Sequence, residues 1–272
     1  MEHAVPSDRV LDLFAVPADL RALPGGQGGS VLAGDLVLSP GRDAVIADAL
    51  SPVVARLAVT LDTRPKRRPR DLRIAMPIPA RDGSWTVEGW SASRYEPGTV
   101  TCSDPAVVRA AGALLHAEFA SAVTDWPLSR QEPRHRWDRA ERAAFGPDTP
   151  DLGSYAAGQA ALAADLLALR DGQPIGPAQL VHADLAGNVL LDGAGAPVVI
   201  DVAPYWRPML WADAVCVLDL VRWFGADPGL LRDWTAGARR QAMIRAAVFR
   251  VLSDIDPDVE RYRCTLESLL GK

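Results

Sequence analysis

Hydrophobic residues recur along this chain with two different periods. Spacings of three and four positions predict helices, and such spacings fill residues 7–22, 42–57, 104–123, 155–170, 212–224, 234–252 and 257–270. Short apolar runs bounded by turn residues predict strands, and these runs lie at residues 36–38, 72–78, 84–95, 180–181, 189–191 and 198–200. The pattern predicts an α+β protein whose first hundred residues are rich in strands and whose remainder is mainly helical.

The tripeptide Glu96-Pro97-Gly98 interrupts the last strand of the first part. Proline and glycine together mark a break in regular structure. We therefore expect an N-terminal domain at residues 1–97 and a C-terminal domain at residues 98–272. No internal repeat and no low-complexity tail accompany this division.

Composition narrows the class of protein. The chain has 272 residues, 49% of them hydrophobic, so it is long enough for a large core. Its formal net charge of −5 argues against a nucleic-acid partner. Its three cysteines are far apart and indicate neither a zinc site nor a disulfide framework. No apolar run approaches the roughly 20 residues of a membrane span, and the N-terminus lacks a signal-peptide pattern. We expect a cytoplasmic protein without a membrane partner, and nothing in the sequence indicates an oligomeric state.

One segment, residues 180–201, gathers the side chains that a phosphoryl-transfer site uses. Its polar residues are His182, Asp184, Asn188 and Asp201. The apolar runs between them predict a hairpin with Asp184 and Asn188 on a loop and Asp201 at a strand end. Asn188 and Asp201 offer the hard oxygen ligands that suit Mg²⁺, Asp184 is placed to accept a proton from a hydroxyl, and His182 is placed to brace the loop. Each residue alone is also common in ordinary turns, but their order favours a kinase-type site.

This ordered set resembles the motif of the aminoglycoside phosphotransferase and choline kinase group of the protein-kinase-like fold: His-Gly-Asp-Leu, three residues, Asn, then Ile-Asp. The resemblance implies a small N-terminal antiparallel β-sheet lobe with a helix, and a larger, mainly helical C-terminal lobe that carries the catalytic β-hairpin. It implies transfer of a phosphoryl group from ATP, or another nucleoside triphosphate, to a hydroxyl of a small molecule, with Mg²⁺ as cofactor. Two positions depart from the motif: Ala183 replaces a common glycine, and Asn188 follows Asp184 by four residues where the family has five.

A glycine-rich stretch lies between two strand-like runs near the N-terminus. Its residues are Gly25, Gly26, Gln27, Gly28, Gly29 and Ser30. Glycines let backbone N–H groups approach phosphates closely, as in a kinase glycine-rich loop, although a glycine-rich hairpin turn is the commoner explanation of such a stretch. The resemblance further implies that the segment around Ser93 and Tyr95 borders the adenine.

The lysine that the family uses to hold the nucleotide phosphates is missing. Ser39 stands where the resemblance places it, and the next helix offers only Asp43 and Asp48 where the family has a glutamate. Three explanations remain open: a basic residue comes from elsewhere, with the basic run at residues 64–70 as the obvious source; the site binds nucleotide weakly without turnover; or the alignment misplaces the lysine.

Residues beyond Asp201 complete the predicted site. The short loop up to Pro208 occupies the place of the family's activation segment, and Tyr205, Trp206 and Arg207 on it are the candidates for acceptor contacts. Asp213 resembles the aspartate by which the family ties the next helix to the catalytic loop, but an acidic residue near a helix N-terminus is also favoured by the helix dipole. His116 is expected to be an ordinary helix histidine, and the arginines of residues 236–250 are expected to form a solvated helix face.

Two functions follow from these observations. The first is a small-molecule phosphotransferase, which the intact set from His182 to Asp201 favours. The second is a pseudokinase-like protein that binds a nucleotide or a partner with little or no transfer, which the missing lysine and glutamate favour. The sequence favours the enzyme and leaves the identity of the acceptor open.

Overall fold

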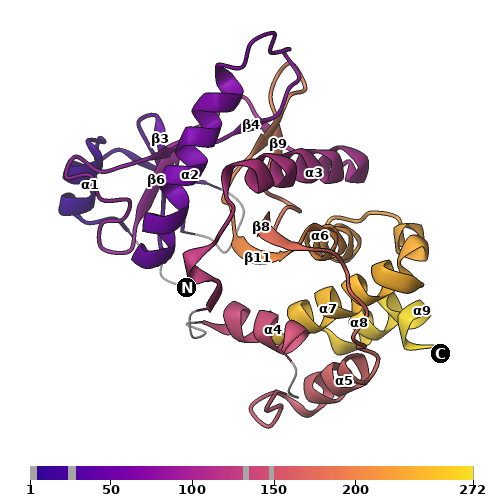
Figure 1. Cartoon of the computed structure of the whole chain (residues 1–272). Helices are drawn as coiled ribbons and strands as arrows, with labels where there is room; N and C mark the ends of the chain where they lie inside the picture. The colour runs from indigo at the N-terminus through magenta and orange to yellow at the C-terminus, as the bar shows by residue number, and fades with distance from the viewer. Residues whose placement is uncertain (1–4, 24–28, 131–134, 147–149, 272) are drawn as a thin grey trace. The chain divides into compact units, whose positions relative to one another are not determined.

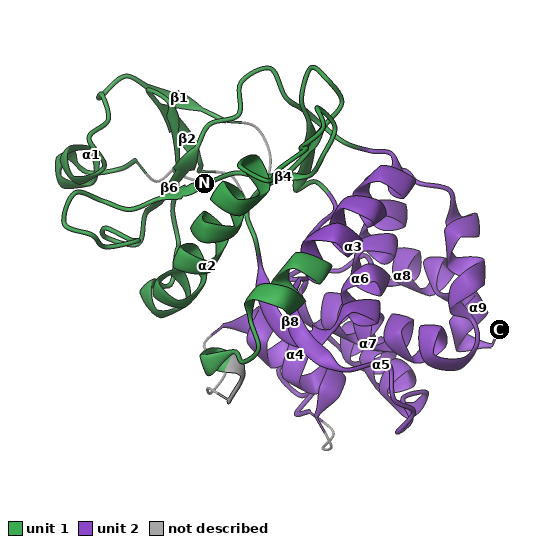
Figure 2. Cartoon of the chain, turned by 45° about the horizontal axis from the view of Figure 1, so that its top comes forward, with its two compact units in different colours: residues 1–102, 117–128, 187–202 green, residues 103–116, 129–186, 203–272 purple. Residues whose placement is uncertain are grey.

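The computed structural model describes residues 5–23, 29–130, 135–146 and 150–271. The chain gathers into two compact units (Figure 2). Unit 1 holds residues 1–102, 117–128 and 187–202, and unit 2 holds residues 103–116, 129–186 and 203–272. Unit 1 thus contains all of the expected N-terminal domain, together with a hairpin that comes much later in the chain. The domain boundaries at residues 97 and 98 stay a prediction.

An antiparallel sheet of five strands forms one part of unit 1 (Figure 1). Its spatial order is β1 (Leu20–Ala22), β2 (Val31–Ala33), β3 (Leu36–Ser39), β6 (Ser91–Arg94) and β5 (Pro77–Ile78). Alternate residues of β3 are buried, because successive side chains of a strand point to opposite faces. Leu38 joins Val10, Phe14 and Trp90 in a hydrophobic cluster, which fixes the sheet against the first helix.

That first helix is shorter than its pattern predicts. α1 spans Asp8–Phe14, and the Ser7 hydroxyl caps it by accepting the backbone N–H of Val10 at 3.3 Å. The helix ends at Ala15, whose φ of 57° is left-handed, just before Pro17. Because proline cannot continue a helical hydrogen-bond ladder, the apolar residues beyond it form β1 instead. The expected helix at residues 7–22 was therefore wrong in its second half.

The helix α2 (Ala44–Asp62) follows β3 and packs against β4 and β5. Its buried residues recur every three or four positions and form one stripe: Ala47, Leu50, Val54, Leu57, Ala58 and Leu61. Among the helices that the structure describes, this one alone is long and apolar enough, by length and composition, to cross a membrane, with a mean hydropathy of 1.7. The single buried stripe is the packing face of an amphipathic helix on a sheet.

A second sheet in unit 1 brings distant parts of the chain together. Its order is β4 (Arg73–Ile74), β10 (Pro197–Val199), β9 (Val189–Leu191) and β7 (Val100–Thr101). β4 pairs with β10 in parallel, whereas β9 pairs antiparallel with both β10 and β7. The expected strand at residues 72–78 therefore divides between two sheets, and the hairpin β9–β10, expected in the C-terminal lobe, belongs to unit 1 through its pairing.

Unit 2 consists of helices and one two-stranded sheet. The strands β8 (Ala178–His182) and β11 (Pro204–Pro208) are antiparallel. The helices are α3 (Pro105–Ala122, of which residues 117–122 belong to unit 1), α4 (Arg136–Phe145), α5 (Ala157–Ala168), α6 (Met209–Trp223), α7 (Gly237–Ser253), α8 (Val259–Thr265) and α9 (Glu267–Leu270), with short 3₁₀ turns at Pro127–Arg130 (of which residues 127–128 belong to unit 1) and Pro228–Trp234. The segment before Pro208, expected to be an activation loop, is thus a strand that completes a sheet with β8.

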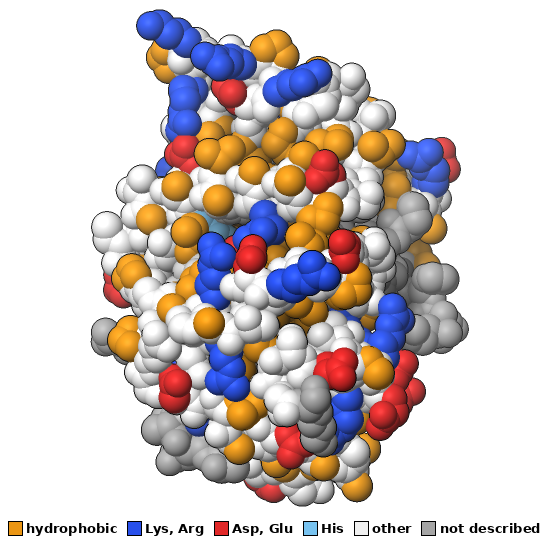
Figure 3. Space-filling view, turned by 90° about the vertical axis from the view of Figure 1, so that its right-hand side faces the viewer, with side chains coloured by type: hydrophobic (Ala, Val, Ile, Leu, Met, Phe, Trp, Pro, Cys, Tyr) orange, Lys and Arg blue, Asp and Glu red, His pale blue; other side chains and the backbone are white. Residues whose placement is uncertain are grey.

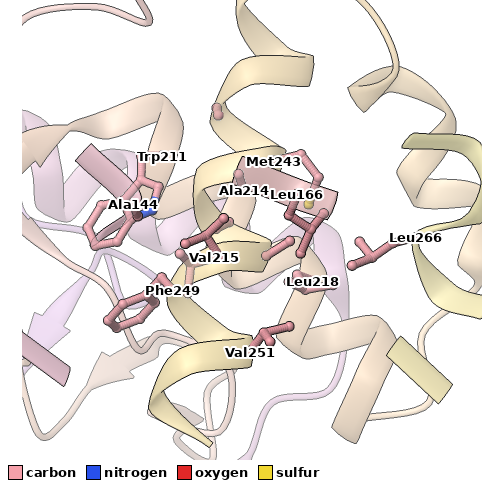
Figure 4. Close-up of a cluster of buried hydrophobic side chains, with 14 of the residues drawn as sticks. Ala144, Leu166, Trp211, Ala214, Val215, Leu218, Met243, Phe249, Val251 and Leu266 are labelled. Carbon is pink, nitrogen blue, oxygen red and sulfur yellow. The ribbon is translucent and has the colours of Figure 1, made fainter. Parts of the chain in front are cut away.

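The core of unit 2 lies around α6 and α7 (Figure 4). Its aromatic centre is Trp211 against Phe249, whose rings meet edge to face with centroids 5.3 Å apart. α7 packs on α4, α5 and α6, and Leu218 and Met243 fill the layer beside the aromatic pair. Apolar residues cover nearly the whole circumference of α6, so this helix is buried on all sides.

A buried histidine anchors β8 to α3 within unit 2. His116 Nε2 accepts the backbone N–H of His182 at 3.1 Å, and the His116 carbonyl accepts the Gln179 side-chain amide at 2.8 Å. Burial, with a smaller contribution from His182, lowers the pKa of His116 to about 3. The expectation of an ordinary helix histidine describes its place on α3, but its ring has a defined partner on the neighbouring strand.

This lowered pKa predicts how stability depends on pH. Below the ordinary pKa of histidine, near 6.5, the unfolded chain binds a proton that folded His116 excludes until about pH 3. The free energy of unfolding should therefore fall as the pH falls through this window, by up to about 1.4 kcal/mol per pH unit from this group. Between about pH 7 and about pH 5.5, urea unfolding should show wild type losing about 1 kcal/mol more than His116→Gln, which keeps an acceptor but does not titrate. Equal losses in the two proteins would show that His116 does not titrate on unfolding.

Candidate active site

The loop after β8 is held by the ring of His182. This side chain is fully buried, and its Nδ1 accepts the backbone N–H groups of Asp184 and Ala203, each at 3.2 Å. A backbone bond from Ala183 N–H to the Ala203 carbonyl, at 3.1 Å, joins the same two segments. The contacts match the bracing role predicted for His182, and they fix the backbone of Asp184 in unit 2.

Leu185 anchors the same loop from its other side. The residue is buried, and it lies against α3 at Gly112, where a Cβ atom would come within 2.4 Å of Leu185 Cδ1. Only a glycine leaves this space open without displacing a neighbour. Asp184 therefore sits between the braced His182 and the seated Leu185, which limits its backbone to a narrow range of positions.

The carboxylate of Asp184 binds a buried arginine. Arg250 on α7 donates from Nη2 to Asp184 Oδ1 at 2.7 Å and from Nε to Asp219 Oδ1 at 2.8 Å, and it also contacts Asp219 Oδ2. The Asp184 side chain is 47% exposed, whereas that of Asp219 on α6 is only 3% exposed. One guanidinium thus bridges two carboxylates, and the one that remains accessible is Asp184.

Burial and charge act in opposite directions in this cluster. Burial lowers the pKa of the Arg250 guanidinium, but the Asp219 and Asp184 carboxylates outweigh it and hold that pKa above its ordinary value. Burial raises the pKa of the Asp219 carboxyl, against the lowering influence of Arg250. The arginine accordingly stays charged, and it fixes the direction in which the Asp184 carboxylate points.

Arg250 lies in a helix whose arginines were predicted to face solvent. The arginines of residues 236–250 were expected to form a solvated face, but Arg245 and Arg250 are buried in α7, and Arg245 donates to Gln241 and to the Asp171 carbonyl. The carboxylates that bind Arg250 and the Asp171 carbonyl that binds Arg245 lie outside α7, so the spacing along α7 does not reveal them. The available signal was Asp219, an aspartate inside the apolar run of α6, since a buried carboxylate requires a charged or hydrogen-bonding partner.

The two predicted metal ligands lie at one end of the β9–β10 hairpin in unit 1. Val189 pairs with Val199, and the next residues outward are tied by a bond from Ile200 N–H to the Asn188 carbonyl at 3.0 Å. Asp201 follows with a φ of 48°, a left-handed conformation that is unusual for a residue with a side chain. Such strain persists where the surrounding structure imposes it and is common at functional sites.

The donor set of this pair suits Mg²⁺. A carboxylate and an amide oxygen are hard ligands, and Mg²⁺ is usually held by one or two protein carboxylates with water and phosphates completing its shell. Within the described residues, no group of three or more acidic, histidine or cysteine side chains could hold a metal ion. Any Mg²⁺ bound at Asn188 and Asp201 would therefore depend on water and a phosphate ligand for the rest of its coordination.

Asp201 already binds a cation from its own chain. Arg42 Nη1 lies 2.6 Å from Asp201 Oδ1 within unit 1, and both side chains are partly exposed. Basic side chains gather at residues 64–70, between α2 and β4 (Figure 3, top). Two of these arginines have partners elsewhere in unit 1: Arg64 binds Glu118 at 2.8 and 2.9 Å, and Arg70 donates to the Ala194 carbonyl. Neither contact involves Asp201.

The described end of the glycine-rich stretch lies against the end of β3. Gly25, Gly26, Gln27 and Gly28 lie outside the described residues. Gly29 has a φ of 96°, and a Cβ atom there would approach Pro40 Cγ to 3.2 Å. The Ser30 and Ser39 hydroxyls are 3.1 Å apart and share a hydrogen bond. Ser39, at the position expected for the lysine, is thus in contact with the described end of the glycine-rich stretch.

Ser93 and Tyr95, predicted to border the adenine, lie on and just after β6. Ser93 pairs with Val37 of β3 and with Pro77 of β5, so its backbone is part of the sheet. The Tyr95 N–H donates to the Asp35 carbonyl at 2.9 Å, and its hydroxyl accepts from Arg21 at 3.5 Å. These contacts fix both residues in unit 1, and their adenine contact stays a prediction.

The three predicted acceptor residues divide between the two faces of β11. Tyr205 packs edge to face on Trp211 and Phe249, and burial raises its pKa. Arg207 binds Glu141 of α4 and lies 4.3 Å from the Phe145 ring. Because side chains alternate along a strand, Trp206 points to the face opposite these two. Tyr205 is therefore a packing residue of the core. Trp206, on the other face of β11, remains the candidate for an acceptor contact.

Asp213 has a different partner from the one expected. Its two oxygens accept from Arg109 of α3 at 2.8 and 2.9 Å, a bidentate ion pair within unit 2. The pair joins α6 to α3, so the supporting role expected of Asp213 is carried by an ion pair with the Arg109 side chain.

Comparisons with known proteins locate this fold. No model of a known protein family matches the sequence, and no curated protein matches it either. Among solved structures, choline kinase LicA from Streptococcus pneumoniae matches with a TM-score of 0.54 and 12% identity over 97% of each chain. An aminoglycoside phosphotransferase from Alicyclobacillus acidocaldarius matches with a TM-score of 0.53 and 13% identity, over 100% of this chain and 95% of that chain.

These two likenesses cover both units and nearly the whole length of each neighbour. At such low identity they bear on the fold alone. The prediction from residues 180–201 is thereby confirmed at that level: the chain has the protein-kinase-like fold in the form found in the choline kinase and aminoglycoside phosphotransferase group.

Proposed function

We propose that this protein is an ATP- and Mg²⁺-dependent phosphotransferase that acts on a hydroxyl group of a small molecule. The observation that carries the proposal is Asp201, which is held in a left-handed conformation beside Asn188 at the hairpin end and binds a cation from its own chain. Such a carboxylate offers a cation-binding point at the place where the motif predicts one. The fold of the two solved neighbours supports the same reaction class.

The residues of the chain would divide the chemistry between them. Asn188 and Asp201 would hold Mg²⁺, which supplies charge neutralisation on the transferring phosphoryl group when it is bound. Asp184 would accept the hydrogen bond, and then the proton, of the attacking hydroxyl. His182 fixes the Asp184 backbone and Arg250 fixes its carboxylate, so both are positioning residues. Catalysis of this kind depends mainly on positioning and electrostatics.

The cysteines bear on where this reaction takes place. Among the residues that the structure describes, Cys216 and Cys264 are free thiols. Free thiols are typical of a reducing compartment. A cytoplasmic location and a small-molecule acceptor belong to the same proposal.

A pseudokinase-like function is the second candidate. Ser39 replaces the lysine and engages Ser30, and Arg42 neutralises Asp201. A protein with these features could bind a nucleotide while transferring phosphate slowly or not at all. The two candidates differ in turnover, not in binding.

Phosphate transfer from ATP to a panel of amino alcohols, aminoglycosides and sugars tests the enzyme. Wild type should transfer phosphate to at least one acceptor, and Asp184→Asn should lower kcat by about 100-fold or more because the amide cannot take the hydroxyl proton. Asp201→Asn should abolish the part of the ATP-induced thermal stabilisation that requires Mg²⁺. Wild type that is stabilised by Mg²⁺ and ATP, but turns over no faster than Asp184→Asn on every acceptor, would support the second candidate. An undiminished Mg²⁺-dependent shift in Asp201→Asn would remove Asp201 from the metal site.

Arg250 offers a separate test of positioning. Arg250→Met leaves the buried Asp219 carboxylate without its cation, so urea unfolding should show a loss of about 3–5 kcal/mol. Arg250→Met combined with Asp219→Leu should recover most of that stability, because the buried charge is gone. Its kcat should nevertheless stay about 10- to 100-fold below wild type, since Asp184 has lost the group that orients it.

The matched control is Arg245→Met, because Arg245 is another buried arginine of α7 and donates to Gln241 and to the Asp171 carbonyl. It should lower stability without a comparable loss of kcat in the folded protein. If the double variant at positions 250 and 219 regains both stability and kcat, Arg250 is structural only.

A further inference from the structure

We propose that Arg42 is the phosphate-binding cation of this site and that it exchanges partners. In the ligand-free chain its guanidinium neutralises Asp201; when a metal ion takes the Asp201 carboxylate, the guanidinium moves to a phosphate of the bound nucleotide. The inference rests on the proposed function, because it assumes that a nucleotide and a metal ion bind in unit 1. It assigns the missing cation to a position three residues after Ser39.

The backbone around Arg42 is firmly held. Its N–H donates to the Gly89 carbonyl at 2.9 Å. Gly41 before it has a φ of 72°, and Asp43 after it caps α2 by accepting the N–H groups of Val45 and Ile46. Arg42 therefore starts from a fixed point between a turn and a helix cap, and the freedom needed for an exchange lies in its long side chain.

This fixed point is close to the glycine-rich stretch. Gly29 approaches Pro40, and Ser30 shares a hydrogen bond with Ser39. Arg42 follows Pro40 by two residues in the same connection between β3 and α2. Gly29 and Ser30, the described end of the glycine-rich stretch, and the segment that carries Arg42 thus lie at the same end of β3 within unit 1.

The ion pair with Asp201 suits an exchange. The Arg42 side chain is 34% exposed and that of Asp201 is 44% exposed, and ion pairs at such exposure contribute little to stability. One contact, from Nη1, joins them, and Arg42 Nε has no hydrogen-bond partner among the described residues. A guanidinium carries five N–H donors in a planar fork that matches phosphate oxygens, so most of its capacity is unused in this state.

Charge balance gives the exchange its direction. A metal ion and a guanidinium compete for the Asp201 carboxylate, since both are cations and both need the same oxygens. A nucleotide phosphate carries more negative charge than the Asp201 carboxylate, so it attracts the displaced guanidinium more strongly. Metal and nucleotide should therefore bind cooperatively: each alone leaves one charge unpaired, and together they pair both.

Two arginines of the basic run considered from the sequence are already engaged. Arg64 is held bidentately by Glu118, and Arg70 donates to the Ala194 carbonyl. Arg64 serves as a matched control, because it is also an arginine of unit 1 with a partly exposed carboxylate partner.

Direct binding measurements test the inference. The ligands are ATP, with and without Mg²⁺, and adenosine, which has no phosphate; titration calorimetry gives each dissociation constant for wild type, Arg42→Ala, Arg42→Lys and Arg64→Ala. Arg42→Ala should weaken Mg²⁺-ATP binding by about 10- to 100-fold and leave adenosine binding within about twofold. Arg42→Lys should fall between, because it keeps the charge but loses the fork, and Arg64→Ala should bind like wild type.

A second measurement uses the metal alone. Mn²⁺, detected by its electron spin resonance signal, should bind Arg42→Ala more tightly than wild type, because the competing guanidinium is gone. Arg42→Gln, which keeps the length of the side chain, repeats both measurements if Arg42→Ala does not fold. Unchanged Mg²⁺-ATP affinity in a folded Arg42 variant, with wild type binding ATP, would overturn the inference and leave the proposed function standing. Wild type that binds neither ATP nor adenosine would instead overturn the proposed function.

Discussion

The buried ring of His182 holds together the segments on which the candidate site depends. Its Nδ1 accepts backbone N–H groups from Asp184 and Ala203, and the backbone N–H of His182 donates to His116 Nε2. Nδ1 accepts only without a proton, so the hydrogen of the neutral ring lies on Nε2. A buried backbone N–H that loses its partner costs about 1–3 kcal/mol, and three such donors rely on two neighbouring imidazoles. The position of Asp184 follows from this pair of histidines and not from its own side chain.

The two candidate carboxylates, Asp184 and Asp201, each bind an arginine, but the two arginines differ in how deeply they are buried. Arg250 reaches Asp184 from α7 with a side chain that is 10% exposed, and a second carboxylate, Asp219, holds it in place. Arg42 reaches Asp201 through one contact near the surface of unit 1. A buried, doubly paired guanidinium cannot leave without exposing an unpaired charge to the interior, whereas an exposed, singly paired one can. The same residue type is therefore a fixed support at Asp184 and an exchangeable partner at Asp201.

The elements that depend on contacts within a short segment could be predicted from the sequence. The hairpin β9–β10 and the helix α3 follow from spacing within short segments, and the structure contains both. The fold was implied by the resemblance that the ordered residues 182–201 carry. The end of α1 went wrong because a single proline outweighs an apolar period. The strand at residues 72–78 divided between two sheets because its second partner, β10, lies more than a hundred residues away. Pairing at that separation leaves no trace in the periodicity of either strand.

Charged partners were the hardest part to predict. Sixty-six positions separate Asp184 from Arg250 in the sequence. The arginines of α7 resemble a solvated helix face because they recur with an ordinary helical spacing. Asp219 was the one warning, a carboxylate in an apolar helix. Arg42 lies only three residues after Ser39, but the resemblance placed the expected lysine on the strand, at the position of Ser39. A strand side chain is fixed by its sheet, and the Ser39 hydroxyl already meets Ser30. A cation placed just outside the strand, between Gly41 and the cap of α2, keeps the charge near the same corner while giving its side chain room to change partners. A phosphate site requires a positive charge at a particular place, and side chains from more than one position in the chain can supply it.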